Sequence, residues 1–421
     1  MREIKDSGVD WIGNVPEHWE LRRAKSMFKQ STSKGNDRLV LLSATQDRGV
    51  VDKSSLDGVV QVSEHADLST FKTVHKNDFV ISLRSFQGGF EISHEEGVIS
   101  PAYTVFRLST QTYPHYYRHL FKSLGFIDKI NSLTVGIREG KNIQYVDFAD
   151  MLLPYMPLAE QQKIAEFLDR KCGEVDEMIA LQEQIIEELK TYKQSVITEA
   201  VTKGLNPSAP MRDSGIDWIG SIPEHWSKDK IIRSFRMIGS GTTPKSTDEN
   251  NFDGDINWIQ SGDINGGVMA SCKNRVSNET IENCSALKVY SAPFIIVAMY
   301  GASVGNTSIS SIDGCVNQAC CVLSDSALNF NYAFSVIKSC KDYWLRKAVG
   351  GGQPNISQET IKQTWIPIPP ITEQQAIADY LDEKCADIDS LIQTKQSKID
   401  SLKEYKKSII YEYVTGKKEV E

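Results

Sequence analysis

The stretch Glu160-Gln161-Gln162 opens an uninterrupted helical pattern that runs from residue 159 to Val201-Thr202-Lys203. About 44 residues at roughly 1.5 Å each would form a rod on the order of 65 Å. The pattern returns 213 residues later at Glu373-Gln374-Gln375, so we expect two long helices, each following a domain of its own. The positions that hold this register are Ile377, Ala378, Leu381, Asp382, Lys384, Cys385, Asp389, Lys403, Tyr405, Lys406, Ser408, Glu412, Val414 and Thr415.

Apolar side chains recur along both segments at alternating steps of three and four residues, which predicts a coiled-coil seam. Antiparallel pairing would place the two domains at opposite ends of the rod, related by a pseudo-twofold axis. The second seam carries Lys395 and Lys398 in its middle. The expected seam positions are Leu168, Lys171, Val175, Met178, Gln182, Ile185, Leu189, Tyr192 and Val196 in the first helix, and Leu381, Ile388, Leu391, Leu402, Tyr405 and Ile409 in the second.

A second repeat lies upstream of each helix. The segment Asp6-Ser7-Gly8-Val9-Asp10-Trp11-Ile12-Gly13 with Pro16-Glu17-His18-Trp19 returns as Asp213-Ser214-Gly215-Ile216-Asp217-Trp218-Ile219-Gly220 with Pro223-Glu224-His225-Trp226. This shift is 207 residues, so the second half has six more residues between its two shared ends. The shared ends predict a framework, in which we expect His18 and His225 to have a packing role.

The segments between the shared ends barely match. Both are punctuated by glycine and asparagine turns, and both finish in paired prolines, Pro154 with Pro157 and Pro367 with Pro370, which favour extended chain before each helix. This mixture predicts an α+β fold built from two tandem α/β domains. The expected strands are 39–42, 79–83, 102–108, 256–259, 294–298 and 319–323, with helical patches near 114–131 and 329–347.

Length and composition describe an ordinary multidomain globular chain. It has 421 residues, a net charge of −8 and a pI near 5.6, so bulk charge alone does not favour nucleic-acid binding. The longest apolar run is too short for a bilayer, which predicts a cytoplasmic protein with no membrane partner. The eight cysteines lack the spacing of a zinc site or a disulfide framework, so we expect buried or idle thiols.

Catalytic signatures are missing from the sequence. It contains neither the phosphate loop of nucleotide hydrolases nor the glycine fingerprint that holds dinucleotides or adenosylmethionine. Gly350-Gly351-Gly352 follows no apolar strand and is interpreted as a flexible loop. We therefore expect no catalytic residues, no metal and no cofactor in this chain.

The shared motifs together resemble the specificity subunit of type I restriction-modification systems. They are Trp-Ile-Gly with Pro-Glu-His-Trp, the Glu-Gln-Gln helix starts and the Val-Thr helix ends, and they span both halves. The resemblance implies two target-recognition domains, each reading half of a bipartite DNA site, and helices that bind methyltransferase subunits. It implies the following division: domain one 1–158, spacer helix 159–203, linker 204–212, domain two 213–370, spacer helix 371–415 and tail 416–421.

The second domain keeps the common pattern of this family and the first departs from it. Shared elements include Thr243-Pro244, Gly262-Asp263-Ile264, Gly301-Ala302-Ser303-Val304-Gly305 and Asn317-Gln318-Ala319. The first domain instead has Lys76-Asn77-Asp78-Phe79 and Ser100-Pro101-Ala102-Tyr103. We therefore expect the two half-sites to differ in sequence.

Candidate DNA contacts follow from side-chain chemistry. Arginine pairs with guanine, asparagine and glutamine pair with adenine, and serine, threonine, lysine and tyrosine hold phosphates. Because Asn142-Ile143 matches Asn355-Ile356, we expect that motif to hold backbone rather than to select a base. The candidates are Arg84, Ser85, Gln87, Arg138, Lys141 and Asn142 in the first domain, and Thr242, Thr243, Lys245, Tyr300, Ser303, Gln353 and Asn355 in the second.

The sequence thus predicts a non-catalytic DNA-binding subunit that reads an asymmetric bipartite target. The resemblance implies double-stranded DNA, two methyltransferase subunits and restriction/translocase subunits as partners. The rival hypothesis is a coiled-coil scaffold, or a competitor for the methyltransferase subunits, that never reads DNA.

Overall fold

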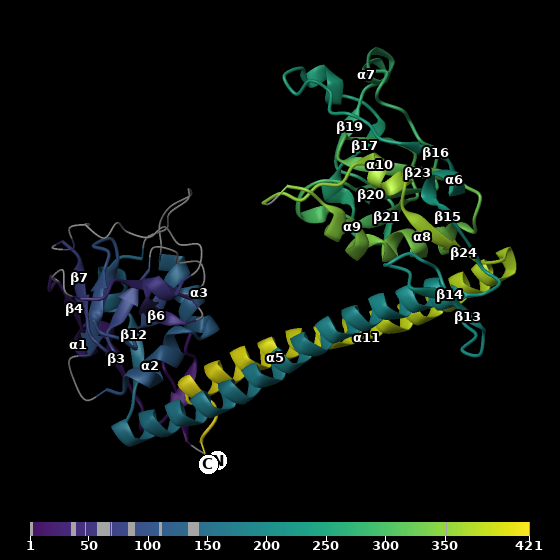
Figure 1. Ribbon diagram of the computed structural model, residues 1–421. Coiled ribbons are helices and arrows are strands. Elements are labelled where there is room, and N and C mark those ends of the chain that lie inside the picture. Colours follow the sequence, from purple (N-terminus) through teal and green to yellow (C-terminus); the bar gives the residue numbers. More distant parts are fainter. Residues whose placement is uncertain are drawn as a thin grey trace. The chain divides into compact units, whose positions relative to one another are not determined.

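The computed structural model describes residues 3–34, 39–46, 48–56, 68, 70–82, 89–108, 112–133, 143–350 and 352–420. The chain forms two compact units (Figure 1). The first unit comprises Met1–Glu183 with Gln396–Glu421, and the second comprises Gln184–Lys395. Each unit holds one mixed helix-and-strand head and one end of each long helix. These helices are α5 (Leu158–Lys203) and α11 (Ile371–Val414).

Both long helices begin after a proline and stop at a glycine. The carbonyl of Pro157 accepts the first helical N–H groups of α5, and that of Pro370 does the same for α11. Gly204 and Gly416 adopt φ +75° and +70°, the left-handed conformation that ends a helix. A Cβ on Gly204 would lie 3.0 Å from the ring of Trp226, so the glycine also permits close packing on the head. No helix in the described part of the chain is long and apolar enough to cross a membrane.

The helices pair antiparallel in each unit, as predicted. In the first unit Lys406 Nζ lies 2.7 Å from Asp176 Oδ1, and in the second unit Lys193 Nζ lies 2.6 Å from Asp389 Oδ2. The two lysines occupy the same repeat position, and so do the two aspartates. The same antiparallel register is therefore present in both units independently.

The predicted seam is correct at alternate positions and wrong between them. Four predicted seam residues, Met178, Tyr192, Leu391 and Tyr405, are 46–59% exposed, and Lys398 is exposed as well. Several buried residues instead lie one position after another predicted seam residue. They include Cys172, Ile186 and Ile197 in α5, and Ile399 in α11. Two apolar stripes run side by side on each helix, and only the partner helix decides which of them is covered.

The first head is built on a four-stranded antiparallel sheet of order β4-β11-β8-β9. Its strands are β4 (Phe28–Ser31), β8 (Phe79–Ile81), β9 (Phe90–Ile92) and β11 (Thr104–Leu108). Around it lie β1 (Ile4–Asp6) paired with β2 (Asn14–Pro16), β3 (Glu20–Arg23) with β12 (Leu152–Tyr155), β5 (Leu42–Thr45) with β6 (Gly49–Asp52), and β7 (Lys72–Val74) with β10 (Gly97–Ile99). The helices are α1 (Ala24–Met27), α2 (Pro114–Phe121), α3 (Leu124–Leu133) and α4 (Tyr145–Asp150), with a 3-10 turn η1 (Lys53–Ser55).

The second head is built on a five-stranded sheet of order β16-β23-β20-β21-β18, beside a three-stranded sheet of order β19-β17-β22. The first comprises β16 (Phe235–Gly239), β23 (Cys320–Ser326), β20 (Phe294–Ala298), β21 (Thr307–Ser310) and β18 (Val268–Met269). The second comprises β19 (Arg275–Val276), β17 (Ile256–Ile259) and β22 (Cys315–Val316). Paired with each other are β13 (Met211–Asp213) and β14 (Ser221–Pro223), and β15 (Ser227–Lys230) and β24 (Trp365–Ile368). The helices are α6 (Ile231–Ser234), α7 (Asn278–Asn283), α8 (Phe330–Ser339), α9 (Lys341–Lys347) and α10 (Gln358–Lys362), with 3-10 turns η3 (Glu249–Phe252), η4 (Ser261–Asp263) and η5 (Gly301–Ser303).

The predicted mixture of helix and strand is confirmed, with two local corrections. Strand β5 begins only at Leu42, whereas the expected strand was 39–42, because the turn between Thr45 and Gly49 sets the register of its hairpin. Each predicted helical patch is two helices, α2 with α3 and α8 with α9. The paired prolines lie in or just after extended strands, as expected, since Pro154 belongs to β12 and Pro367 to β24.

Histidines with lowered pKa values are found in the first unit. Burial is the main cause of the lowered pKa of His94, His115 and His119, and the Arg118 charge contributes at each. Because the unfolded chain then binds protons more readily, the stabilising effect is complete above pH 6.5 and declines as the pH falls below it. We expect acidification from pH 7.5 to 5.5 to lower hydrogen-exchange protection in the first unit more than in the second. Equal loss of protection in both units would contradict this prediction. An undiminished loss in the His119→Gln variant would contradict it as well.

Candidate nucleic-acid interface

A carboxylate at the start of each long helix braces the shared head motif. Glu373 Oε2 accepts the indole N–H of Trp226 at 2.9 Å, and Glu373 Oε1 lies 2.7 Å from His225 Nε2. Glu160 makes the same two contacts, with Trp19 at 3.0 Å and His18 at 2.8 Å. Both tryptophans are buried, while both histidine side chains are about half exposed. The packing role predicted for the histidines is therefore wrong in kind, because they make polar contacts at the surface and the tryptophans fill the core.

The neighbouring glutamine ties the same helix start to two further segments. Buried Gln374 donates to the carbonyl of Pro369 at 2.9 Å and accepts the backbone N–H of Asn329, before α8, at 2.8 Å. Gln161 repeats this with Met156 and Tyr113, each at 2.8 Å. The repeated Glu-Gln pair thus fixes each head on its helix through side-chain contacts that are the same in both units.

The candidate residues of the second head gather at one edge of the five-stranded sheet. Strands β16 and β20 end there, and β23 begins there. The Thr242-Thr243 segment therefore lies beside the turn 317–319 and the turn after β20. Thr243 Oγ1 lies 2.6 Å from Gln318 Oε1, and the N–H of Met299 donates to the carbonyl of Ala319 at 2.7 Å.

The remaining candidates join this edge through the backbone. Ile356 N–H donates to the carbonyl of Met299 at 2.9 Å, and Tyr300 forms an antiparallel bridge with Asn355. Ser303 Oγ donates to the carbonyl of Tyr300 at 3.1 Å, which closes the turn η5. The structure thus brings Thr242, Thr243, Tyr300, Ser303, Gln353 and Asn355 to one surface.

The turn that leads from β16 to Lys245 requires a glycine at position 241, because the backbone there passes close to β22. A Cβ on Gly241 would clash with the carbonyl of Val316, so only glycine allows the loop to pass over β22. Trp258 Nε1 then donates to the carbonyl of Thr242 at 3.2 Å and holds the loop to the three-stranded sheet. Lys245 follows with an exposed side chain. These contacts leave a short basic and hydroxyl-bearing loop at the sheet edge.

The candidates of the first head, Arg84, Ser85, Gln87, Arg138, Lys141 and Asn142, lie outside the described residues. The corresponding edge of its sheet is nevertheless described in part. Lys34 and Lys72 form an isolated antiparallel β-bridge through their backbones. The side-chain Nζ of Lys72 donates to the carbonyl of Tyr103 at 2.5 Å. Burial lowers the pKa of Lys72. Lys34 and Lys72 were not predicted, and two lysines separated by 38 positions carry no local sequence signal.

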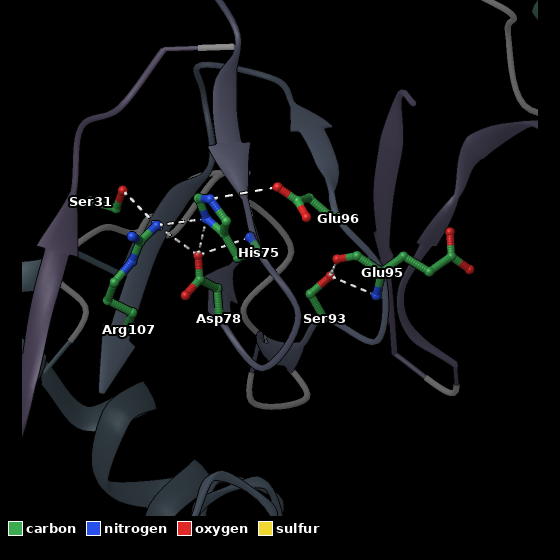
Figure 2. Close-up of polar contacts among 7 residues, drawn as sticks. All are labelled: Ser31, His75, Asp78, Ser93, Glu95, Glu96 and Arg107. Carbon is green, nitrogen blue, oxygen red and sulfur yellow. Dashed lines mark hydrogen bonds and ion pairs between the residues drawn. The ribbon is translucent and has the colours of Figure 1, made fainter. Parts of the chain in front are cut away.

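A buried carboxylate in the first head holds the turn before β8 (Figure 2). Asp78 Oδ2 accepts from Arg107 Nη2 at 2.9 Å and from the backbone N–H of His75 at 3.0 Å. Arg107 Nη2 also donates to Ser31 Oγ at 3.2 Å, and the imidazole of His75 lies 3.7 Å from Glu96. This cluster joins β4, β8 and β11, so the first head's own Asn77-Asp78-Phe79 motif serves to anchor the fold.

Gln318 and the basic pair Arg346 and Lys347 are further surface groups that were not among the predicted contacts. Gln318 is exposed beside Thr243, and its Asn-Gln-Ala motif was noted only as a family pattern. Arg346 and Lys347 are exposed at the end of α9, next to the segment that carries Gln353 and Asn355. Arg346 and Lys347 lie a few residues before Gly350-Gly351-Gly352, and this proximity in the sequence could have marked them as candidate contacts.

The cysteines fit the expectation of buried or idle thiols. All eight are free, and five are buried: Cys172, Cys315, Cys320, Cys321 and Cys340. Burial raises the pKa of the Cys172 thiol to about 11 and that of Cys315 to about 12, which keeps them protonated. Among the residues that the structure describes, no group of three or more His, Cys, Asp or Glu side chains could hold a metal ion.

Comparison with known proteins agrees with this geometry. Residues 223–414 match the model of the type I restriction modification DNA specificity domain. The putative type I restriction enzyme MjaX specificity subunit of Methanocaldococcus jannaschii is 23% identical, over 96% of this chain and 95% of that protein. The second half of the chain thus matches the type I specificity domain, and nearly the whole chain is similar to a type I specificity subunit.

Other type I specificity subunits are similar to this chain as well. The EcoBI specificity subunit of Escherichia coli is 28% identical over 63% of this chain and 58% of its own length. A chain from a structure of the assembly and conformational transition of a type I R-M system has a TM-score of 0.72 at 16% identity, covering 95% of this chain and 98% of that one. The HsdS subunit from Thermoanaerobacter tengcongensis has a TM-score of 0.53 at 17% identity, covering 96% and 98%. These two structures share the fold.

Proposed function

We propose that this chain is the DNA-recognition subunit of a type I restriction-modification enzyme, and that its two heads read unlike halves of one bipartite target. The observation that carries the proposal is the contrast within each head. Glu160 and Glu373 make the same contact with a tryptophan in the two heads. The sheets of the two heads differ, because the first has four strands and the second has five. A common frame with dissimilar surfaces is what two different sequence readers require.

The proposal assigns the chemistry to other subunits. In this view the chain is not itself an enzyme, works in the cytoplasm, and delivers two methyltransferase subunits and the restriction/translocase subunits to the site. Adenosylmethionine, ATP and Mg²⁺ would bind those subunits.

Equivalent exposed apolar pairs on the helices support a partner present in two copies. The first unit exposes Met178 and Tyr405, and the second exposes Tyr192 and Leu391. Met178 and Leu391 occupy one repeat position, and Tyr192 and Tyr405 occupy another. Each pair combines one residue from α5 with one from α11. Because each unit offers the same pair, the same partner surface would fit both.

The division of labour at the second sheet edge follows from which residues are shared. Asn355 exchanges two backbone hydrogen bonds with Val349, so it holds the loop, and its equivalent Asn142 would do the same. Thr242, Thr243, Lys245, Tyr300, Ser303 and Gln353 remain as proposed contacts with bases or phosphates. In the first head the proposed contacts are Arg84, Ser85, Gln87, Arg138 and Lys141.

The rival hypothesis, a scaffold or competitor that binds methyltransferase subunits without DNA, gives the opposite result in one experiment. The chain is purified with its methyltransferase partner, and its binding to a library of duplexes is measured. We expect protection of a single interrupted, asymmetric sequence, and we expect Lys245→Ala to weaken binding to all duplexes about three- to tenfold and to reduce the salt dependence. Lys288→Ala, an exposed lysine outside the proposed edge, is the control. Equal affinity for unrelated sequences, or no effect of Lys245→Ala, would favour the scaffold.

A further inference from the structure

Val349 is an apolar residue in an unusual position. Its side chain is 72% exposed, the highest value among the large apolar residues that the structure describes. Its backbone is nevertheless firmly held. Val349 N–H donates to the carbonyl of Asn355 at 3.0 Å, and Asn355 N–H donates to the carbonyl of Val349 at 2.9 Å. The valine is therefore fixed in place with its methyl groups facing outward.

The segment that carries Val349 is attached to the proposed recognition edge. Asn355 also bridges to Tyr300, and Gly301 N–H donates to the carbonyl of Pro354 at 2.9 Å. Gly350 has φ +100°, a conformation that requires glycine, so the chain can reverse directly after the valine. In Figure 1 this yellow-green segment extends outward beside α9. It forms a narrow projection whose two arms are Val349 and Asn355.

The surroundings of Val349 favour a polyanion with an apolar feature. Arg346 and Lys347 precede it at the end of α9, both are exposed, and neither has an ion-pair partner among the described residues. Tyr300 and Gln353 are exposed next to it. A duplex presents phosphates on either side of its major groove, and the apolar group within that groove is the C5-methyl of thymine.

We propose that Val349 is a specificity-determining residue of the second head, and that it contacts a thymine methyl in the major groove of the second half-site. This inference rests on the proposed DNA-recognition function. Arg346 and Lys347 bind the flanking phosphates and position the projection, while Asn355 maintains its backbone. The valine supplies selectivity at one base pair, because a cytosine at that place offers an amino group and no methyl.

Removing one thymine methyl group at a time from the DNA tests the proposed contact with Val349. The natural target of the chain with its methyltransferase partner is first found by mapping methylated adenines in host DNA. Each thymine of the second half-site is then replaced singly by deoxyuridine, which lacks only the methyl. We expect affinity to fall about two- to fivefold at one thymine, the loss for one buried methyl group. Val349→Ala should lower affinity for the natural duplex by a similar factor and show no further loss at that thymine.

Val268→Ala is the matched control, because Val268 is a 63% exposed valine of the same head on β18. It should respond to every deoxyuridine as the wild type does. The inference is overturned if no thymine responds in the wild type, if Val349→Ala keeps the full response, or if it weakens all duplexes alike, as a protein-binding role or a fold defect would. A wild-type complex that binds every sequence equally would instead refute the proposed function, before any variant is made.

Discussion

Lengthening both long helices by one heptad is expected to abolish recognition of the natural target, with a loss of affinity of roughly a hundredfold, about what the specific contacts of one half-site contribute. The insertion is placed after Gln182 in α5 and after Lys395 in α11, which are the same repeat position. Seven residues add about 10 Å to a helix. That distance corresponds to about three base pairs, and three base pairs also rotate the second half-site around the duplex.

The antiparallel register explains why both helices must be lengthened together. The pairs Asp176–Lys406 and Lys193–Asp389 lie on either side of the insertion points, so a double insertion leaves each unit's own contacts intact. Insertion into α5 alone would move Lys193 and Asp389 apart by seven residues. Replacing residues 183–189 by the same heptad, without lengthening, is the control. Binding is measured against duplexes with spacers of increasing length, and retention of the natural spacer at full affinity would refute the idea that the helices set the distance.

Glu373→Ala is expected to destabilise the second unit by about 2 kcal/mol, because it removes the acceptor of a buried indole N–H. Trp226 is 2% exposed, and its Nε1 donates to Glu373 Oε2 at 2.9 Å. For a unit of this size the loss corresponds to a fall in Tm of about 4–8 °C. Thermal unfolding followed by tryptophan fluorescence measures it, with hydrogen exchange used to assign the change to the second unit.

Two companion variants separate the hydrogen bond from other effects of the substitution. Glu373→Gln keeps an oxygen acceptor for the indole and should lose less than half as much stability as Glu373→Ala. Glu359→Ala removes an exposed carboxylate of α10 in the same head, where it contacts Gln363, and should change Tm by little. If Glu359→Ala and Glu373→Ala were equally destabilising, the brace would have no special role.

The sequence predicted the repeated framework well because its signals are local or duplicated. The helix starts at Glu160 and Glu373 follow paired prolines, and the helix ends precede glycines that need a left-handed conformation. These features act within a few residues of the chain, where the sequence determines the conformation directly. The comparison of two copies also separated shared from variable positions. It identified Glu-Gln-Gln and Pro-Glu-His-Trp as framework without indicating that they touch each other.

The seam was mispredicted because periodicity cannot distinguish two adjacent apolar stripes. Ile185 and Ile186 satisfy a seven-residue repeat equally well, and only the packing of the folded chain decides that Ile186 is the buried one. The surface left uncovered carries Met178, Tyr192, Leu391 and Tyr405. These exposed residues form the two pairs that we propose as the partner surface.

What the sequence alone determined is the repeat, the two helices and the presence of two unlike heads. Only the tertiary structure decided which of these residues meet. Glu373 and Trp226 lie 147 positions apart, and Thr243 and Gln318 lie 75 apart. Val349 has no motif around it, and the role that we propose for it rests on its backbone being held by Asn355 while its side chain is exposed. Such contacts depend on the path of the whole chain, since strand order and helix register bring together residues that no local spacing connects.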